Sequence, residues 1–144
     1  LMLGHDELHA LQWIATRTPL DARVQVDPIA RDPGTWAYIP AFGERRMSAG
    51  LPISMIPITP YQEASAQARR LYTAPDAASV LRAARALHVD VIVVGPEEHK
   101  AHPQFRALLD ANPLAFPALF RTRNVNLYAA SGRMRALTQT QTRR

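Results

Sequence analysis

The sequence contains no cysteine, no apolar run of membrane-spanning length and no glycine-rich loop. The absence of cysteine excludes disulfides, thiolate nucleophiles and cysteine-based zinc sites. A bilayer-spanning helix needs roughly 20 consecutive apolar residues, and the longest runs here are far shorter, so we expect a soluble unit. The chain begins at Leu1 without an initiator Met and shows no signal peptide, which favours a domain cut from a longer protein over a remnant of cloning.

Two common catalytic and nucleotide-binding motifs are also missing. The segment VVGPEEH, residues 93–99, has one glycine followed by proline, whereas dinucleotide binding needs several glycines so that the backbone can approach a pyrophosphate. No serine lies between two glycines, as a hydrolase nucleophile elbow requires, and the segment MSAG around Ser48 lacks the first glycine. The sequence therefore supports neither a dinucleotide site nor a serine hydrolase.

The net charge of +5 is concentrated at the carboxyl end of the chain. All 12 acidic residues precede position 131, and nearly as many basic residues balance them there, whereas the last residues carry four arginines and no acid. We predict that residues 131–144 form a basic, disordered tail. Because no aromatic residue is interleaved with these charges, nucleic acid is not expected as a partner. Nucleic-acid binding through the tail, the least favoured alternative, would show a steep salt dependence.

Helical and strand patterns alternate along residues 1–130, which predicts a single α/β domain with a mixed sheet and helices packed on it. Apolar spacing indicates helices from residue 5 to the stop at Thr18-Pro19, over 61–72, from 76 to about 88, and over 103–111. A short strand is predicted within 21–28. The segment VDVIVVG, residues 89–95, is β-branched and apolar on both faces, as in a central strand covered on both sides. Alternation over 116–130 predicts a closing antiparallel hairpin.

Glu97, Glu98 and His99 follow the central strand directly and form the first candidate ligand site. Carboxylates and imidazoles can act as acid or base groups or as metal ligands. The alternative is that residues 95–102 are only a solvated loop where a buried strand reaches the surface. His99 and His102 are three residues apart, whereas the established helical metal signature has four, so we predict no metal site and no cofactor.

Arg45 and Arg46 form a second candidate ligand site, after a turn at Phe42-Gly43. An arginine can bind an anionic group through two parallel hydrogen bonds. Adjacent residues of a strand point to opposite faces, so only one of the two could serve a given site. No catalytic residue is predicted at either place.

Four segments in this order resemble a known family: ALQWIATRTPLDARVQVDP, TWAYIPAFGERRMSAG, LRAARALHVDVIVVGPEEH and NVNLYAA. Together they look like the C-terminal soluble region of bacterial multi-spanning membrane glycosyltransferases of the C superfamily and of related uncharacterised membrane proteins. The resemblance covers about residues 8–130. The positions that match the family pattern are Trp13, Pro19, Asp21, Arg45, Arg46, Gly50, Asp90, Gly95 and Glu97. The proline-rich segment LPISMIPITP and the basic tail depart from it.

The resemblance implies a soluble accessory domain on the extracytoplasmic face of a bacterial membrane. The parent protein would be a glycosyltransferase, whereas this domain alone would not be catalytic, because the family's catalytic carboxylates lie in loops between membrane helices. Its partner would be the membrane-embedded part of the same polypeptide, and it would help to position a glycan or a lipid-linked sugar acceptor. The alternative is a free-standing α/β ligand-binding module or enzyme with its site at residues 95–102.

Overall fold

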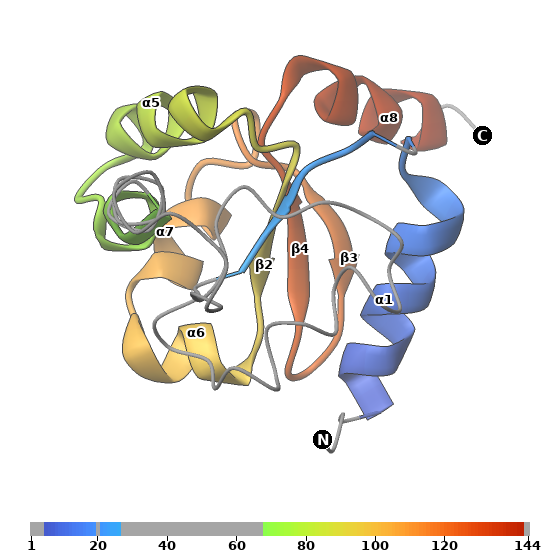
Figure 1. Ribbon diagram of the computed structural model, residues 1–144, viewed down its shortest axis with the longest axis horizontal. Helices are drawn as coiled ribbons and strands as arrows, with labels where there is room; N and C mark the ends of the chain where they lie inside the picture. Colours follow the sequence, from blue (N-terminus) through green and yellow to red (C-terminus); the bar gives the residue numbers. More distant parts are fainter. Residues whose placement is uncertain (1–4, 20, 27–67, 143–144) are drawn as a thin grey trace, which may run out of the picture.

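The computed structural model describes residues 5–19, 21–26 and 68–142 (Figure 1). A four-stranded sheet lies at its centre, with the strand order β1-β2-β4-β3. β1 (Val24–Gln25) runs parallel to β2 (Val91–Val94), and β4 (Asn126–Ala129) pairs antiparallel with both β2 and β3 (Ala118–Arg121). The predicted α/β fold with a mixed sheet is confirmed. The elements predicted between residues 27 and 67 lie outside the described residues.

β2 is the central strand that the run VDVIVVG predicts. All four of its residues are buried. Ile92 and Val94 belong to the apolar cluster on one face of the sheet, and Val91 and Val93 belong to the cluster on the other face. This division follows from the strand geometry, in which successive side chains point to opposite faces. A strand covered on both faces therefore has no polar position.

Helices cover both faces of the sheet. Helical residues 68–73, α5 (Ala77–Leu87) and α7 (Phe105–Asp110) pack on one face, and α1 (His5–Arg17) and α8 (Gly132–Thr142) pack on the other. In Figure 1, α5 and α7 lie on the left of the strands, and α1 lies on the right with α8 above it. The fully or almost fully buried residues that these helices contribute include Leu71, Val80 and Leu109 on the first face and Leu11, Ile14 and Met134 on the second. In the described part of the chain, no helix is both long and apolar enough to cross a membrane.

α5 begins and ends with recognisable caps. Asp76 has an extended backbone, and its carboxylate accepts a hydrogen bond from the Ser79 N–H at 2.8 Å. The helix ends at His88, which adopts the left-handed conformation with φ 56° and ψ 40°. The His88 N–H donates to the carbonyl oxygens of Ala84 and Arg85. Glycine is the usual residue at such a position, so a histidine here is notable.

The closing hairpin is formed by β3 and β4, as predicted. Thr122 and Val125 close its turn through two hydrogen bonds of 2.9 Å: the Thr122 N–H donates to the Val125 carbonyl, and the Val125 N–H donates to the Thr122 hydroxyl. Leu119, Val125 and Leu127 all lie in the cluster under α1 and α8. These three apolar residues therefore cover one face of the hairpin.

The carboxyl end differs from the expectation of a disordered tail, because residues 132–142 form α8. Met134 is fully buried, and Leu137 packs against the same cluster. Arg133 forms ion pairs with Asp90 and Asp21. These contacts reach far back along the chain, and they attach α8 to the sheet although its own sequence is mostly polar.

Candidate functional site

Glu97, Glu98 and His99 lie on a short helix. α6 (Pro96–Ala101) begins directly after β2, with Gly95 as its N-cap. The Glu98 Oε1 atom accepts a hydrogen bond from the Gly95 N–H at 2.8 Å, and the residue is fully buried. This contact is the reciprocal half of a capping box, and a carboxylate there also complements the positive end of the helix dipole. The prediction of a loop at residues 95–102 is therefore wrong for α6, because these local contacts stabilise a helix.

Helix geometry separates Glu97, Glu98 and His99, the predicted ligand-binding residues of this segment. Neighbouring side chains on an α-helix point about 100° apart, and here Glu98 is buried, Glu97 half-buried and His99 exposed. His102 follows the end of α6, and its ring stacks on Tyr72 at 5.8 Å between centroids. In the region that the structure describes, no three acidic or histidine side chains gather in a way that could hold a metal ion. Of the three, Glu98 caps the start of α6, Glu97 is partly accessible and His99 is exposed.

Polar side chains join the carboxyl ends of the parallel strands β1 and β2. The Tyr72 hydroxyl lies 2.8 Å from the carbonyl oxygens of both Gln25 and Val93. Since it has one hydrogen, it donates to one carbonyl at a time and ties the two strands together. The fully buried Gln25 donates from Nε2 to the Val26 carbonyl at 2.6 Å. Ligand sites of α/β sheets are usually found at such carboxyl ends, so a site is best sought at this edge.

A hollow of about 640 Å³ opens beside this edge, between residues 72–75 and the connection from α6 to α7. We call it the aromatic hollow, because Tyr72, His102 and Phe105 line it. The Tyr72 ring is nearly parallel to His102, at 21°, and lies 4.9 Å from Phe105 at an angle of 52°. Tyr72 and Phe105 are buried, His102 is half-buried and Gln104 is exposed. A ligand would therefore meet the imidazole and the Gln104 amide, which suit an uncharged ring that also carries hydroxyls.

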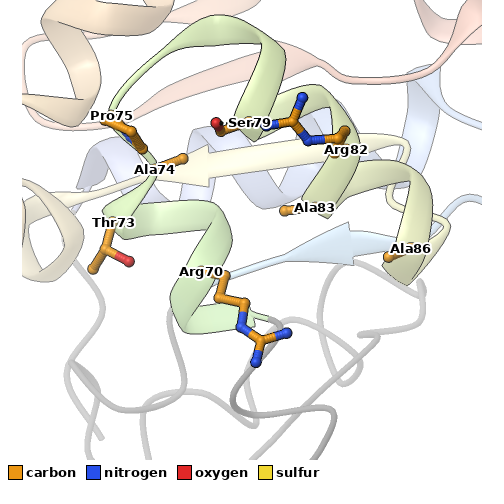
Figure 2. Close-up of a pocket in the computed structure, with 8 residues that line it drawn as sticks. All are labelled: Arg70, Thr73, Ala74, Pro75, Ser79, Arg82, Ala83 and Ala86. Carbon is orange, nitrogen blue, oxygen red and sulfur yellow. Dashed lines mark hydrogen bonds between the residues drawn. The ribbon is translucent and has the colours of Figure 1, made fainter.

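Arg45 and Arg46 lie outside the described residues. Two other arginines, Arg70 and Arg82, border a hollow of about 430 Å³ between helical residues 68–73 and α5 (Figure 2). Figure 2 shows that their guanidinium groups do not point toward one another. Arg82 instead donates to the Ser79 hydroxyl at 3.0 Å. Much of the remaining wall is alanine, so these groups do not converge on a common ligand position.

Asp90, at the start of β2, ties α8 to the sheet. Its carboxylate accepts hydrogen bonds from the Arg23 N–H at 2.9 Å and from Nε and Nη2 of Arg133 at 3.1 and 2.8 Å. Arg133 Nη1 also donates to Asp21 at 2.9 Å. Burial opposes the ionisation of Asp90, but hydrogen bonds from Arg133, Ser131 and Arg23 outweigh it, so its pKa is lowered. We call Asp21, Asp90 and Arg133 the Asp90 clamp.

A second ion cluster joins α7 to the hairpin. Asp110 Oδ1 accepts hydrogen bonds from the Tyr128 hydroxyl and from Arg121 Nη2, both at 2.8 Å. Burial and the hydrogen bond to Asp110 raise the pKa of Tyr128 to about 12. Burial would also raise the pKa of Asp110, but the hydrogen bonds from Arg121 and Tyr128 outweigh it and lower that pKa. Because the carboxylate and the guanidinium neutralise each other, we assign this cluster to the stability of the fold.

The sequence matches no protein-family model and no curated protein. Among solved structures, the fold is similar to that of the C-terminal globular domain of the oligosaccharyltransferase AglB-S2 from Archaeoglobus fulgidus. The superposition has a TM-score of 0.62 and covers 91% of this chain and 100% of that domain, at 12% sequence identity. At this identity, the likeness shows that the two domains share a fold.

Proposed function

We propose that this chain is a non-catalytic soluble accessory domain of a membrane glycosyltransferase-like protein. The observation that carries the proposal is the fold shared with the C-terminal globular domain of an oligosaccharyltransferase, over 91% of this chain and the whole of that domain. Many functions can share one fold, so a second line of support matters. The motifs in residues 8–130 supply it, since they resemble the C-terminal region of bacterial membrane glycosyltransferases.

Three of the described acidic residues are buried or engaged by arginines, which favours binding over catalysis. A general acid or base must reach the reacting proton with an accessible group. Glu98 is buried at the start of α6, and both Asp90 and Asp110 are engaged by arginines. The alternative of a free-standing enzyme with its site at residues 95–102 therefore loses Glu98, the fully buried carboxylate of that segment.

In the proposed role, the domain docks on the membrane-embedded part of its own polypeptide at the extracytoplasmic face of a bacterial membrane. The aromatic hollow then holds a ring of a glycan or of a lipid-linked sugar acceptor. The apolar face of a sugar can stack on the imidazole of His102, and its hydroxyls can bond to the Gln104 amide. The hollow lies at the edge of the sheet where α/β folds commonly bind ligands.

The assignment of this domain to a membrane glycosyltransferase-like protein can be tested in the gene sequence. We expect the reading frame that encodes this chain to encode several apolar segments of membrane-spanning length before Leu1. A complete reading frame without such segments would refute the assignment to a membrane glycosyltransferase.

The glycan role can be tested on the isolated chain by saturation-transfer NMR with a panel of neutral oligosaccharides. We expect transfer to at least one oligosaccharide, and we expect His102→Ala to abolish most of it. His99→Ala is the matched control, because His99 is an exposed histidine on α6 that does not line the aromatic hollow. Equal signals from the two variants would show that the aromatic hollow does not bind the glycan.

A further inference from the structure

A hollow of about 480 Å³ lies at the end of the sheet where β1 and β2 begin and β4 ends. The last turn of α5 and the first turn of α8 border it. It is lined by the Asp90 clamp together with three more arginines and a histidine, namely Arg23, Arg85, Arg135 and His88. We call it the basic hollow. It is at the opposite end of the parallel strands from the aromatic hollow.

The basic hollow has more positive than negative charge. Four guanidinium groups and two carboxylates line it, which leaves an excess of two positive charges among these groups. The Asp90 clamp pairs Arg133 with both carboxylates. The excess therefore resides mainly on Arg23, Arg85 and Arg135.

These three arginines have hydrogen-bond donors to spare. Arg23 Nη1 donates to the Leu87 carbonyl at 3.4 Å, and Arg135 Nη1 donates to the Ala115 carbonyl at 3.2 Å. Each contact uses one of the five N–H groups of a guanidinium. Arg85 is exposed and has no acidic partner within residues 5–19, 21–26 and 68–142. Guanidinium groups with free N–H pairs match the oxygens of a phosphate.

The backbone at His88 adds an independent observation. A side chain crowds the left-handed conformation, and glycine would relieve this strain. His88 nevertheless occupies it, and the residue lines the basic hollow. Residues held in unfavourable backbone conformations are found more often at functional sites. The histidine therefore adds a polar ring to the wall of the hollow at a position where glycine would fold more easily.

We infer that the basic hollow binds a terminal phosphate, carried by a small molecule or by a lipid headgroup. A terminal phosphate has a charge close to −2 at neutral pH, which matches the excess positive charge of the hollow. The volume also leaves room for atoms beyond the phosphate. The inference goes beyond the proposed function, because it requires neither a glycan nor a membrane-embedded partner. The hollow in Figure 2 is the competing location, and its two arginines point apart.

The experiment compares Arg85→Gln with Arg82→Gln. Both residues are exposed on α5, but Arg85 lines the basic hollow and Arg82 lines the other one. Isothermal titration calorimetry with inorganic phosphate at low salt measures the affinity for a phosphate in solution. Flotation with phosphatidylcholine vesicles that contain phosphatidic acid, or the same fraction of phosphatidylglycerol, measures the lipid form. Only phosphatidic acid presents a terminal phosphate.

We expect binding either to inorganic phosphate or, in preference to phosphatidylglycerol, to phosphatidic acid. Arg85→Gln should weaken it roughly tenfold, as the loss of one charge-assisted contact does, and Arg82→Gln should leave it unchanged. Equal weakening by the two variants would overturn the inference. Binding to neither probe would also overturn it, as would equal flotation with both acidic lipids in the absence of binding to inorganic phosphate.

His88→Gly separates binding from folding. We expect this variant to melt at a higher temperature than the wild type, because glycine fits the left-handed conformation, and yet to bind phosphate several-fold more weakly. A loss of binding in a more stable protein cannot come from unfolding. Unchanged phosphate affinity would contradict the assignment of His88 to the site.

Discussion

Asp90→Ala should destabilise the fold far more than Asp21→Ala, although both carboxylates bind Arg133. The Asp90 side chain is 9% exposed and the Asp21 side chain is 79% exposed. Removing Asp90 leaves the Arg23 N–H without its acceptor and Arg133 without its buried partner. Removing Asp21 leaves a position that water can fill.

The expected loss can be built from these contacts. A hydrogen bond to a charged group contributes about 1.5–3 kcal/mol. The hydrogen bond from the Arg23 N–H contributes its full free energy. The Arg133 side chain is 44% exposed, so water replaces much of the interaction that it loses when Asp90 is removed. We therefore expect Asp90→Ala to lower the free energy of unfolding by about 2–3 kcal/mol. An exposed pair contributes about 0.2–1 kcal/mol, which bounds the effect of Asp21→Ala.

Urea unfolding followed by far-ultraviolet circular dichroism at pH 7 measures both losses. The pH dependence gives a second readout. Because the folded-state pKa of Asp90 is lowered from 3.8, its contribution is complete above the unfolded-state value and is lost as the pH falls through the folded-state value. The difference in stability between wild type and Asp90→Ala should thus be constant from pH 7 to about 5 and shrink below about 4.

Two outcomes would refute this reasoning. One is an equal loss of stability in Asp90→Ala and Asp21→Ala at pH 7. The other is an additive double-mutant cycle, in which Arg133→Ala costs as much in the Asp90→Ala background as in the wild type. Either result would mean that the clamp does not hold α8 to the sheet.

Three further predictions concern other contacts. Glu98→Ala should lower the free energy of unfolding by about 1–2 kcal/mol, because it removes the cap of α6. His99→Ala, at an exposed position, should change it by less than about 0.5 kcal/mol, and equal urea midpoints for the two variants would contradict the capping role. Tyr72→Phe removes the hydroxyl between two strand carbonyls, so it should cost about 1–2 kcal/mol and speed amide exchange in β1; unchanged exchange would count against the tie. Tyr128 should ionise only near pH 12. The difference between the ultraviolet titrations of wild type and Tyr128→Phe should therefore be flat through pH 10 to 11, and a step near pH 10 would argue against the burial of Tyr128 beside Asp110.

The local patterns were sufficient for the sheet and most of its helices. β2 has no polar position because both faces are covered, and this produces the apolar run that predicts it. α5 starts at an aspartate three residues before the N–H that it caps, which is a local signal. α6 also carried local signals, since Pro96 stands at its first position and Glu98 at its third. The charge of this segment is typical of a loop, but the proline and the capping glutamate outweigh it and start a helix.

The remaining features depend on residues that are distant in the sequence. Asp90 and Arg133 meet only once β2 and α8 are in place, so no window of sequence contains both sides of the clamp. In the aromatic hollow, Tyr72 from helical residues 68–73 lies beside His102 from the connection after α6. His102 could be noticed in the sequence only as a metal ligand. The left-handed backbone of His88 also has no local signal, because glycine would be expected there.

The strand order has a consequence for how the chain assembles. β3 and β4 are neighbours in the sequence, and β2 joins β4 across α6 and α7, whereas β1 must meet β2 across residues 26–90. Closing a longer loop costs more conformational entropy, and pairings of distant residues form later in folding. Residues 89–130 are thus expected to form the nucleus, and α1 and β1 to dock onto it afterwards. Amide protons of β1 should then exchange with solvent through a partial opening that leaves β2, β3 and β4 paired. In this order of folding, the hydrogen bonds of the Tyr72 hydroxyl hold β1, the last strand to join the sheet, against β2.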